Sequence, residues 1–375
     1  MFRSLTTLEA VEGAVVTVAG RRLVCWCSND YLGLSQHPAL VQAAAQAAAA
    51  FGVGARASRL LAGTTTCHRR LEESLAAWFG AEAALVFSSG YLANLGAIGS
   101  LASPQDAIVL DRMAHASLFE AARATRATVR VFRHNDADHA ASVLARLRAA
   151  RRRWLVTEGV FSMDGDVAPL AALAEVAQRQ EALLYLDDAH GAFVRGAGGR
   201  GSPEDAGVSP ERFLYMGALG KALGCQGGFV AADAAVIDRL RNRAKPFIYT
   251  TGLAVPVAAA AAAALRVLQD TPGLRARLAE RVTQLHEALE QARIPASRTR
   301  THIVPVLIGS AKQAVAVSQQ LLDRGLLAPA IRPPTVPRGT ARLRLSVTAS
   351  HTPAHLAALV QGLRDACAPL APLGG

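Results

Sequence analysis

Short apolar runs recur along the first 230 residues of the chain and alternate with longer amphipathic or alanine-rich stretches. Short runs bounded by Gly, Asp or Pro are typical of buried strands, whereas the longer stretches have the spacing of helices, as at 138–150 and 170–180. The predicted strands are 84–87, 107–110, 128–132, 154–157, 183–187, 213–216 and 228–231. This alternation predicts an α/β fold with a mostly parallel, seven-stranded sheet flanked by helices.

The pattern changes near residue 271, where a long charged stretch replaces the strand-helix alternation. The later segments predict helices at 274–292 and 311–324 and strands at 303–308 and 341–348. We therefore expect a smaller α+β domain at the C-terminal end. The expected division is an N-terminal arm (1–35), a large α/β domain (36–270) and a small C-terminal domain (271–375).

Length and composition fit a globular protein with a large core, since the chain has 375 residues and 51% of them are hydrophobic. Its longest uncharged stretches are alanine-rich and shorter than the ~20 residues of a membrane-spanning helix. The first residues lack the apolar segment of a signal peptide. These features predict a cytoplasmic protein.

The formal charge of +11 raises the possibility of nucleic-acid binding. The arginines are scattered, however, with one dense run at 151–153, and aromatic residues make up only 5% of the chain. We therefore expect no nucleic-acid partner, and an anionic substrate such as an acyl-CoA suits the charge better. The five cysteines have no matching Cys/His pairs, so we expect reduced thiols and no metal site.

Lysine is rare in this chain, which has three lysines (Lys221, Lys245 and Lys312) against 37 arginines. Lys221 lies between glycines, in a turn just after the predicted strand 213–216. Arginine can replace lysine wherever only a positive charge is needed, but its guanidinium cannot form a Schiff base. Lys221 is therefore either an ordinary lysine in a turn or an amine that reacts with a carbonyl.

Polar motifs follow several predicted strands at their carboxyl ends, where ligands collect in parallel sheets. Ser88-Ser-Gly-Tyr91 opens a helix whose N-terminus can hold a phosphate. Asp187-Asp-Ala-His190 and Thr157-Glu-Gly-Val-Phe-Ser-Met-Asp164 end two further strands, and Lys221 follows a third. A phosphate cradle, an aspartate, a histidine and a lysine at neighbouring strand ends suit pyridoxal 5′-phosphate (PLP). The glycine pattern at 196–201 fits a dinucleotide fingerprint, but it lies beyond its strand and predicts an ordinary loop.

An ordered set of motifs between Arg3 and Leu363 resembles the α-oxoamine synthases, which are fold-type I PLP-dependent transferases. The motifs are Ser28-Asn-Asp-Tyr-Leu-Gly33, Ala57-Ser-Arg-Leu60, His68-Arg-Arg-Leu-Glu72, His115-Ala-Ser117, Thr157-Glu-Gly-Val-Phe-Ser-Met-Asp-Gly-Asp166, Asp187-Asp-Ala-His-Gly191, Gly220-Lys221 and Ala330-Ile-Arg-Pro-Pro-Thr-Val-Pro337. Each motif alone is weak, but their order along the chain is specific. The resemblance implies an enzyme that uses PLP as its cofactor.

The resemblance also implies roles around the cofactor ring. Lys221 would bind the cofactor as a Schiff base and later move protons. Asp187 would pair with the ring nitrogen, and His190 and Ser162 would bond the phenolic oxygen. His115 would stack on the ring and contact the substrate.

At the cofactor phosphate, the resemblance implies backbone contacts from Gly90 and Tyr91 and a contact from Thr251 of the other subunit of a homodimer. One position departs from the family pattern. Ala218 stands three residues before Lys221, where the family usually has a Ser or Thr hydroxyl that reaches the phosphate. We therefore expect one phosphate hydrogen bond fewer at this position.

On the substrate side, the resemblance implies that Arg344 grips the carboxylate of an amino acid in a bidentate fork. Asn29 is a further substrate-binding candidate, and Arg3 and Thr335 match positions that contact the acyl group. Arg342, on the same strand as Arg344, has no assigned substrate contact.

The implied reaction condenses L-alanine with pimeloyl-CoA, or with a pimeloyl-acyl carrier protein, with loss of CO2. Two related reactions stay open, namely glycine with succinyl-CoA and glycine with acetyl-CoA. A protein of this fold that binds the cofactor without catalysis is the alternative of another class. The residues at 330–335 resemble the two glycine-using relatives least.

Overall fold

The structure is a computed structural model that describes residues 5–297 and 299–367. Within these residues the chain forms two compact units. The large unit comprises His37–Phe161 and Val167–Thr271, and the small unit combines the described parts of Met1–Gln36, Ser162–Asp166 and Pro272–Gly375. The division at residues 35 and 270 stays a prediction, and the segment 162–166 clusters with the small unit.

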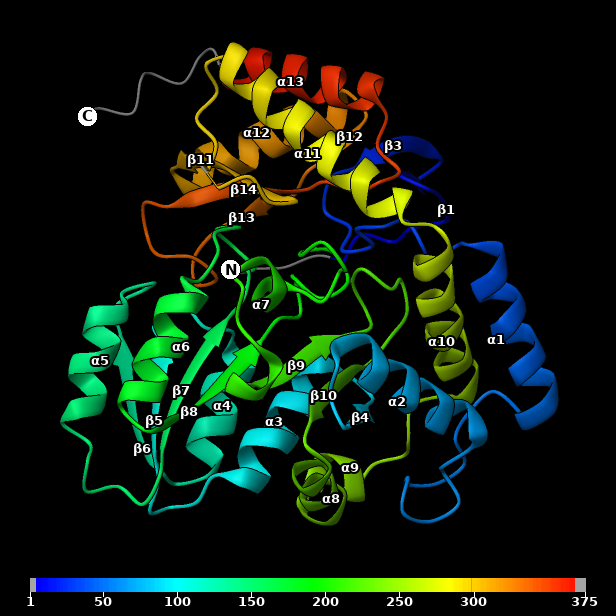
Figure 1. The fold of residues 1–375 in the computed structure, drawn as a ribbon. Helices are drawn as coiled ribbons and strands as arrows, with labels where there is room; N and C mark the ends of the chain where they lie inside the picture. Colours follow the sequence, from blue (N-terminus) through cyan, green and yellow to red (C-terminus); the bar gives the residue numbers. More distant parts are fainter. Residues whose placement is uncertain (1–4, 298, 368–375) are drawn as a thin grey trace. The chain divides into compact units, whose positions relative to one another are not determined.

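A seven-stranded sheet forms the centre of the large unit (Figure 1). In spatial order its strands are β4 (Ala83–Phe87), β10 (Gly228–Ala232), β9 (Leu214–Ala218), β8 (Ala182–Asp187), β7 (Arg153–Glu158), β5 (Ala107–Asp111) and β6 (Thr128–Phe132). Strand β10 runs antiparallel to both of its neighbours, whereas the pairs from β9 to β6 are parallel. The predicted α/β fold with a mostly parallel sheet is confirmed, and all seven predicted strands are present.

Helices cover both faces of this sheet because alternate residues of each buried strand point to opposite faces. On one face, Leu85, Ile108 and Tyr185 pack in a buried cluster with residues of three helices. These helices are α3 (Gly90–Leu101), α4 (Ala116–Ala124) and α8 (Ala234–Arg243). On the other face, Phe79 at the end of α2 (Thr66–Phe79) contacts the rings of Tyr215 and Phe229.

Further helices of the large unit follow the sequence pattern closely. Helix α6 (Leu170–Arg179) buries Leu170, Leu173 and Ala177, the helical spacing of one face. The predicted helix 138–150 was too long, because α5 (Ala137–Ala145) ends at Ala145. Residues 146–150 form turns with i→i−3 hydrogen bonds. The remaining helical segments are α1 (Pro38–Phe51), the single-turn α7 (Ser202–Asp205), the 3₁₀ turn Pro210–Arg212, α9 (Lys245–Ile248) and α10 (Val255–Asp270). Residues 196–201 form a loop with turns, as predicted.

The small unit has two sheets of its own. One consists of β11 (Ile303–Gly309), β14 (Ala341–Ser346) and β13 (Ala330–Ile331). The other joins β1 (Ala10–Glu12), β2 (Val15–Val18), β3 (Arg21–Cys25) and β12 (Leu326–Leu327). Helices α11 (Gly273–Gln291), α12 (Ala311–Asp323) and α13 (Pro353–Cys367) complete this unit. The predicted α+β character of the C-terminal segment is confirmed.

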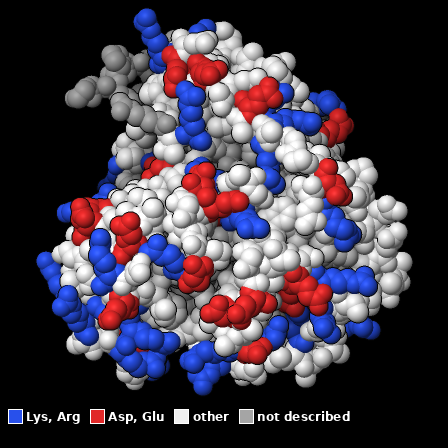
Figure 2. Space-filling model, viewed as in Figure 1, with Lys and Arg blue, Asp and Glu red and all other residues white. Residues whose placement is uncertain are grey.

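Charged side chains are mixed in sign on the face seen in Figure 2, where blue and red groups alternate without a broad single-sign surface. Among the described helices, none combines the length and the apolar composition that crossing a membrane requires.

Candidate active site

A cavity of about 370 Å3 lies at the carboxyl-end edge of the large unit's sheet. It is formed where β4, β5, β7, β8 and β9 end, because parallel strands bring their carboxyl ends to one edge. Its lining includes Ser89, Gly90, Tyr91, Asn94, His115, Ser117, Glu158, Asp187, Ala189, His190, Ala218, Gly220, Lys221 and Gly227. Six residues predicted for the site therefore meet here: Gly90, Tyr91, His115, Asp187, His190 and Lys221.

The N-terminus of α3 forms one wall of the cavity. Ser89 caps the helix, its Oγ accepting the Leu92 N–H at 3.1 Å and its carbonyl the Ala93 N–H at 3.0 Å. Gly90 and Tyr91 come before Leu92 in the first turn of the helix, where backbone N–H groups have no partner within the helix. Their N–H groups can therefore bind an anion. Gly228 of β10 lets this turn sit close, since a Cβ there would lie 2.5 Å from the Gly90 Cα.

Two consecutive aspartates at the end of β8 have different surroundings. Asp187 is buried and lines the cavity, where Oδ1 accepts the Ala189 N–H at 3.0 Å and Oδ2 accepts Asn94 Nδ2 at 2.7 Å. Asp188 accepts hydrogen bonds from Ser202 N–H, Ser202 Oγ–H and the hydroxyl of Tyr215 instead. Burial raises the pKa of Asp188 to about 6. Asp188 therefore holds the loop after β8, while Asp187 is available to a ligand.

Glu158 is a third carboxyl group at this edge and was not among the predicted site residues. It ends β7 and pairs with Asp187 in the sheet register. Burial first, and then the charge of Asp187, raise the pKa of Glu158 well above its ordinary value. Among the described residues, its Oε1 has no hydrogen-bond partner. A buried polar atom without a partner inside a cavity is consistent with a ligand contact.

His115 has two roles, as the N-cap of α4 and as a wall of the cavity. Its Nδ1 accepts the Ser117 backbone N–H at 3.3 Å and lies 2.8 Å from Ser117 Oγ. Burial lowers the pKa of His115, and the charge of Lys221 lowers it further against the opposing effect of Asp187. The ring is therefore neutral, with its proton on Nε2, because a backbone N–H must meet an unprotonated nitrogen.

Lys221 lies in the turn after β9, which is closed by a hydrogen bond from the Gly224 N–H to the Lys221 carbonyl. The lysine is half-buried and lines the cavity. Its charge acts on Glu158 and on His115. Ala218, three residues earlier, contributes only a methyl group to this wall.

In the small unit, Arg344 and Asn29 lie close together. Arg344 is buried on β14 and donates to Asn29 Oδ1 and to the Tyr31 hydroxyl, each at 3.4 Å, and to Ser346 Oγ at 2.8 Å. Arg342 is buried two residues earlier and pairs with Asp164. The guanidinium of Arg342 is thereby committed to a structural ion pair.

The other predicted residues do not line the cavity. Ser162 belongs to the small unit, where its carbonyl accepts a hydrogen bond from Arg344. Thr335 is exposed in the small unit, and Thr251 is exposed in the large unit, where it forms an isolated bridge with Ser58. Arg3 lies outside the described residues. Their expected contacts with cofactor or substrate stay predictions.

The cavity fits PLP by the chemistry of its donor set. It combines anion-binding N–H groups, a buried carboxylate, an amine and an unpartnered carboxyl oxygen. Asn94, Ser117 and Glu158 were missed as site residues. Asn94 could have been found as the one strongly polar side chain in the apolar helix sequence Gly90-Tyr-Leu-Ala-Asn94-Leu, and the other two occur within the quoted motifs.

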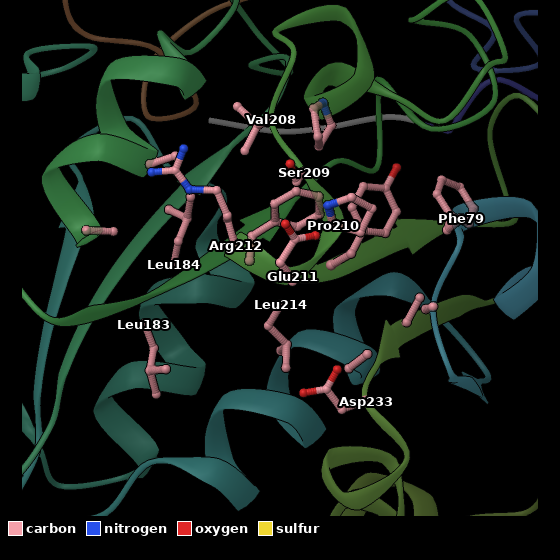
Figure 3. A pocket seen from close by; sticks show the side chains of 18 of the residues that line it. Phe79, Leu183, Leu184, Val208, Ser209, Pro210, Glu211, Arg212, Leu214 and Asp233 are labelled. Carbon is pink, nitrogen blue, oxygen red and sulfur yellow. The ribbon is translucent and has the colours of Figure 1, made fainter.

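A second cavity, of about 1240 Å3, lies at the opposite edge of the same sheet (Figure 3). It is lined by Leu183, Leu214 and residues of the loop before β9, including Glu211 and Arg212. Arg212 donates to Gln178 at 2.7 Å on the protein surface. The acids and bases that line this larger cavity are exposed or half-buried, whereas Asp187 and Glu158 in the smaller cavity are buried.

The chain matches the sequence model of the family described as aminotransferase class I and II over residues 21–363. It is 46% identical over 353 residues to an 8-amino-7-oxononanoate synthase of Geobacter sulfurreducens, covering 94% of this chain and 90% of that protein. It is 44% identical over 352 residues to the protein of the same name from Methylobacillus flagellatus, covering 94% and 89%.

Solved structures show the same fold. A variant of serine palmitoyltransferase from S. paucimobilis, with a bound PLP–myriocin aldimine, matches with a TM-score of 0.94 at 32% identity, covering 97% of this chain and 92% of that one. An 8-amino-7-oxononanoate synthase from Francisella tularensis matches with a TM-score of 0.78 at 26% identity, covering 92% and 97%.

Proposed function

The chain belongs to the aminotransferase class I and II family, and from this premise we propose that it is a PLP-dependent acyltransferase that makes 8-amino-7-oxononanoate. The reaction joins L-alanine to the pimeloyl group of pimeloyl-CoA or of a pimeloyl-carrier protein and releases CO2, a step of biotin synthesis. The curated relatives at 44–46% identity support this substrate pair. The observation that carries the proposal is the meeting of Lys221, Asp187 and His115 with the α3 N-terminus in one cavity.

Bound PLP would supply an electron sink that makes the α-hydrogen of alanine acidic. Lys221 Nζ would attach the cofactor covalently and, once displaced by alanine, move the proton at the α-carbon. Asp187 would keep the ring nitrogen protonated by offering it a carboxylate oxygen. The N–H groups of Gly90 and Tyr91 would bind the phosphate, and His190 would bond the phenolic oxygen.

Neutral His115 would face the substrate with its Nε2–H, which can donate a hydrogen bond but cannot accept a proton. Removal of the α-proton therefore belongs to Lys221, the basic group at this wall. Arg344 would bind the alanine carboxylate, with Asn29 beside it. Hydrogen bonds between a guanidinium and a carboxylate are charge-assisted and therefore strong. Ser162, Thr335 and Arg3 are included in this proposal as contacts to the cofactor or the acyl group.

A homodimer is part of the proposal, and large apolar side chains exposed on the large unit support it. Leu61, Tyr249 and Leu60 are exposed by 80%, 79% and 51%. Apolar groups of this size are normally covered by a partner when they cluster. Thr251 follows Tyr249 closely and would reach the phosphate in the other subunit. The cytoplasmic location expected from the sequence stays a prediction.

A CoA-release assay that crosses amino acids with acyl-CoA substrates tests the proposed function. Alanine, glycine and serine are each combined with pimeloyl-, succinyl-, acetyl- and palmitoyl-CoA. We expect the highest kcat/KM for alanine with pimeloyl-CoA. Preference for glycine with succinyl- or acetyl-CoA would replace this proposal by one of the related reactions, and preference for serine with palmitoyl-CoA by the activity named for the S. paucimobilis relative. If no pair reacts, a pimeloyl-carrier protein is supplied, and failure there too would leave a cofactor-binding protein without this catalysis.

A further inference from the structure

Asn94 lies at the junction of the polar groups behind the cavity. It is 1% exposed on α3, one helical turn beyond Gly90. Its Nδ2 lies 2.7 Å from Asp187 Oδ2 and 2.9 Å from Ser117 Oγ, and its Oδ1 lies 2.8 Å from the hydroxyl of Tyr185. All three polar bonds of this amide are therefore made within the protein interior.

The direction of each hydrogen bond follows from the donors present. The Tyr185 hydroxyl donates to Asn94 Oδ1, which leaves both amide N–H bonds for Asp187 and Ser117. The reversed amide would place its oxygen against the Asp187 carboxylate, where two acceptors would repel each other. Ser117 Oγ accepts from Asn94 and so donates its own hydrogen to His115 Nδ1.

We infer that Asn94 is a positioning residue that orients Asp187 toward the ring nitrogen of the cofactor, with Tyr185 fixing the direction of the amide. This inference rests on the proposed function, since it assigns Asp187 to the ring nitrogen. The bond from Asn94 and the bond from the Ala189 N–H hold the two oxygens of Asp187 separately. The carboxylate cannot rotate without breaking one of them, and a bond to a buried charge is among the stronger kinds.

The inference distinguishes Asn94 from a residue that merely stabilises α3. A role through Asp187 affects only ligands that present a protonated ring nitrogen. A general structural role weakens every ligand of the cavity alike. An analogue of PLP in which carbon replaces the ring nitrogen separates the two, because it keeps the phosphate and the aldehyde.

The test measures dissociation constants of PLP and of the carbon analogue for the wild type and for Asn94→Leu, which keeps the side-chain size but removes all three hydrogen bonds. We expect PLP to bind about ten- to a hundred-fold more weakly to Asn94→Leu, while the analogue changes by less than about threefold. Tyr185→Phe, which keeps the ring packed, should show the same selectivity with a smaller loss. Ser100→Ala is the matched control, because it removes a buried hydrogen bond to the Gly96 carbonyl on the same helix.

Equal losses for PLP and the analogue, or no loss for PLP, would overturn the role of Asn94. If Asn94→Leu does not fold, the same comparison in Tyr185→Phe decides. The ring nitrogen of 15N-labelled PLP gives a second readout, since its chemical shift should move toward the unprotonated form in both variants. If the wild-type protein binds PLP at another lysine or not at all, the proposed function fails. An equal loss of affinity for PLP and the analogue in the variants would overturn only the role of Asn94.

Discussion

The two edges of the large unit's sheet carry cavities of opposite character. The cavity at the amino-end edge is more than three times as large, about 1240 Å3 against 370 Å3, and is lined by apolar side chains and by charged ones that are exposed or half-buried. The smaller cavity is lined by Asp187, Glu158, His115 and Lys221 together with the N-terminus of α3. Volume alone therefore does not identify a site, whereas buried carboxyl groups that converge with a histidine and a lysine do.

The difference has a topological cause. Parallel strands β7, β8 and β9 deliver Glu158, Asp187 and the turn with Lys221 to the same edge, one strand apart. The opposite edge receives the starts of these strands, where loops return from the helices. The parallel topology therefore brings the functional side chains of several strands to the carboxyl-end edge.

The largest expected effect is the loss of Lys221. Lys221→Ala should abolish turnover and leave no cofactor that borohydride can fix, because an alanine cannot form the covalent bond. Activity with alanine and pimeloyl-CoA and the bound cofactor after reduction are measured. Lys245→Ala, on α9, is the control and should keep both. Substantial turnover in Lys221→Ala would break the contrast between the two edges.

A hundred-fold or greater fall in kcat/KM is expected for Asp187→Asn, since a neutral amide cannot stabilise the positive ring nitrogen. Asp188→Asn is the adjacent control and should act on thermal stability rather than on cofactor binding, because Asp188 bonds Ser202 and Tyr215. Steady-state kinetics and thermal unfolding of both variants test this. A loss of activity in Asp188→Asn together with a loss of thermal stability alone in Asp187→Asn would show that Asp188, and not Asp187, acts on the cofactor.

Ala218→Thr should tighten PLP binding about tenfold by supplying the hydroxyl that the family usually has at this position. Ala218→Val, which adds similar volume without a hydroxyl, separates the hydrogen bond from simple filling of the wall. Dissociation constants of PLP are compared. Equal affinities of the Thr and Val variants would show that the phosphate does not use this position.

A smaller and pH-dependent effect is expected for Glu158→Gln. The pKa of Glu158 is raised in the folded protein, so the folded state keeps a proton that the unfolded chain loses above the ordinary carboxyl pKa. This contribution to stability is therefore lost as pH rises. Glu158→Gln removes that dependence, and its free energy of unfolding should rise relative to wild type as the pH increases above about 5. Denaturant unfolding of the cofactor-free proteins checks the sign, and a constant difference across this range would contradict it.

The smallest effect is expected at the amino-end edge. Arg212→Ala removes a surface hydrogen bond to Gln178 and should change PLP affinity and turnover by less than about twofold. The same binding and kinetic assays apply. A tenfold effect would show that the larger cavity communicates with the site.

The sequence predicted the sheet well because six of its seven strands are largely buried apolar runs, and β6, an exposed edge strand, keeps the β-branched and aromatic residues typical of strands. Helix α5 was overextended because its polar and alanine-rich continuation at 146–150 keeps helical composition after the hydrogen bonds have turned. Lys221, Asp187 and His115 could be predicted from the sequence, because they occur in motifs at or just after the ends of predicted strands. Their meeting in one cavity followed from the parallel topology.

The hydrogen-bond network of Asn94 and Tyr185 behind the cavity could not be predicted from the sequence. Asn94 and Tyr185 are 91 positions apart along the chain, and their bond depends on how α3 packs on the sheet. The local sequence gives no indication that the pKa of Glu158 is raised, because the shift follows from its burial beside Asp187. Long-range packing therefore decides the parts of the site that the motifs do not reveal.

The most direct test of the account is to locate the cofactor on the wild-type protein. The purified protein is saturated with PLP, reduced with borohydride and digested, and the modified peptide is sequenced by mass spectrometry. We expect a single modified residue, Lys221, in the turn at the carboxyl-end edge of the sheet. Modification of Lys245 or Lys312 in place of Lys221 would contradict it.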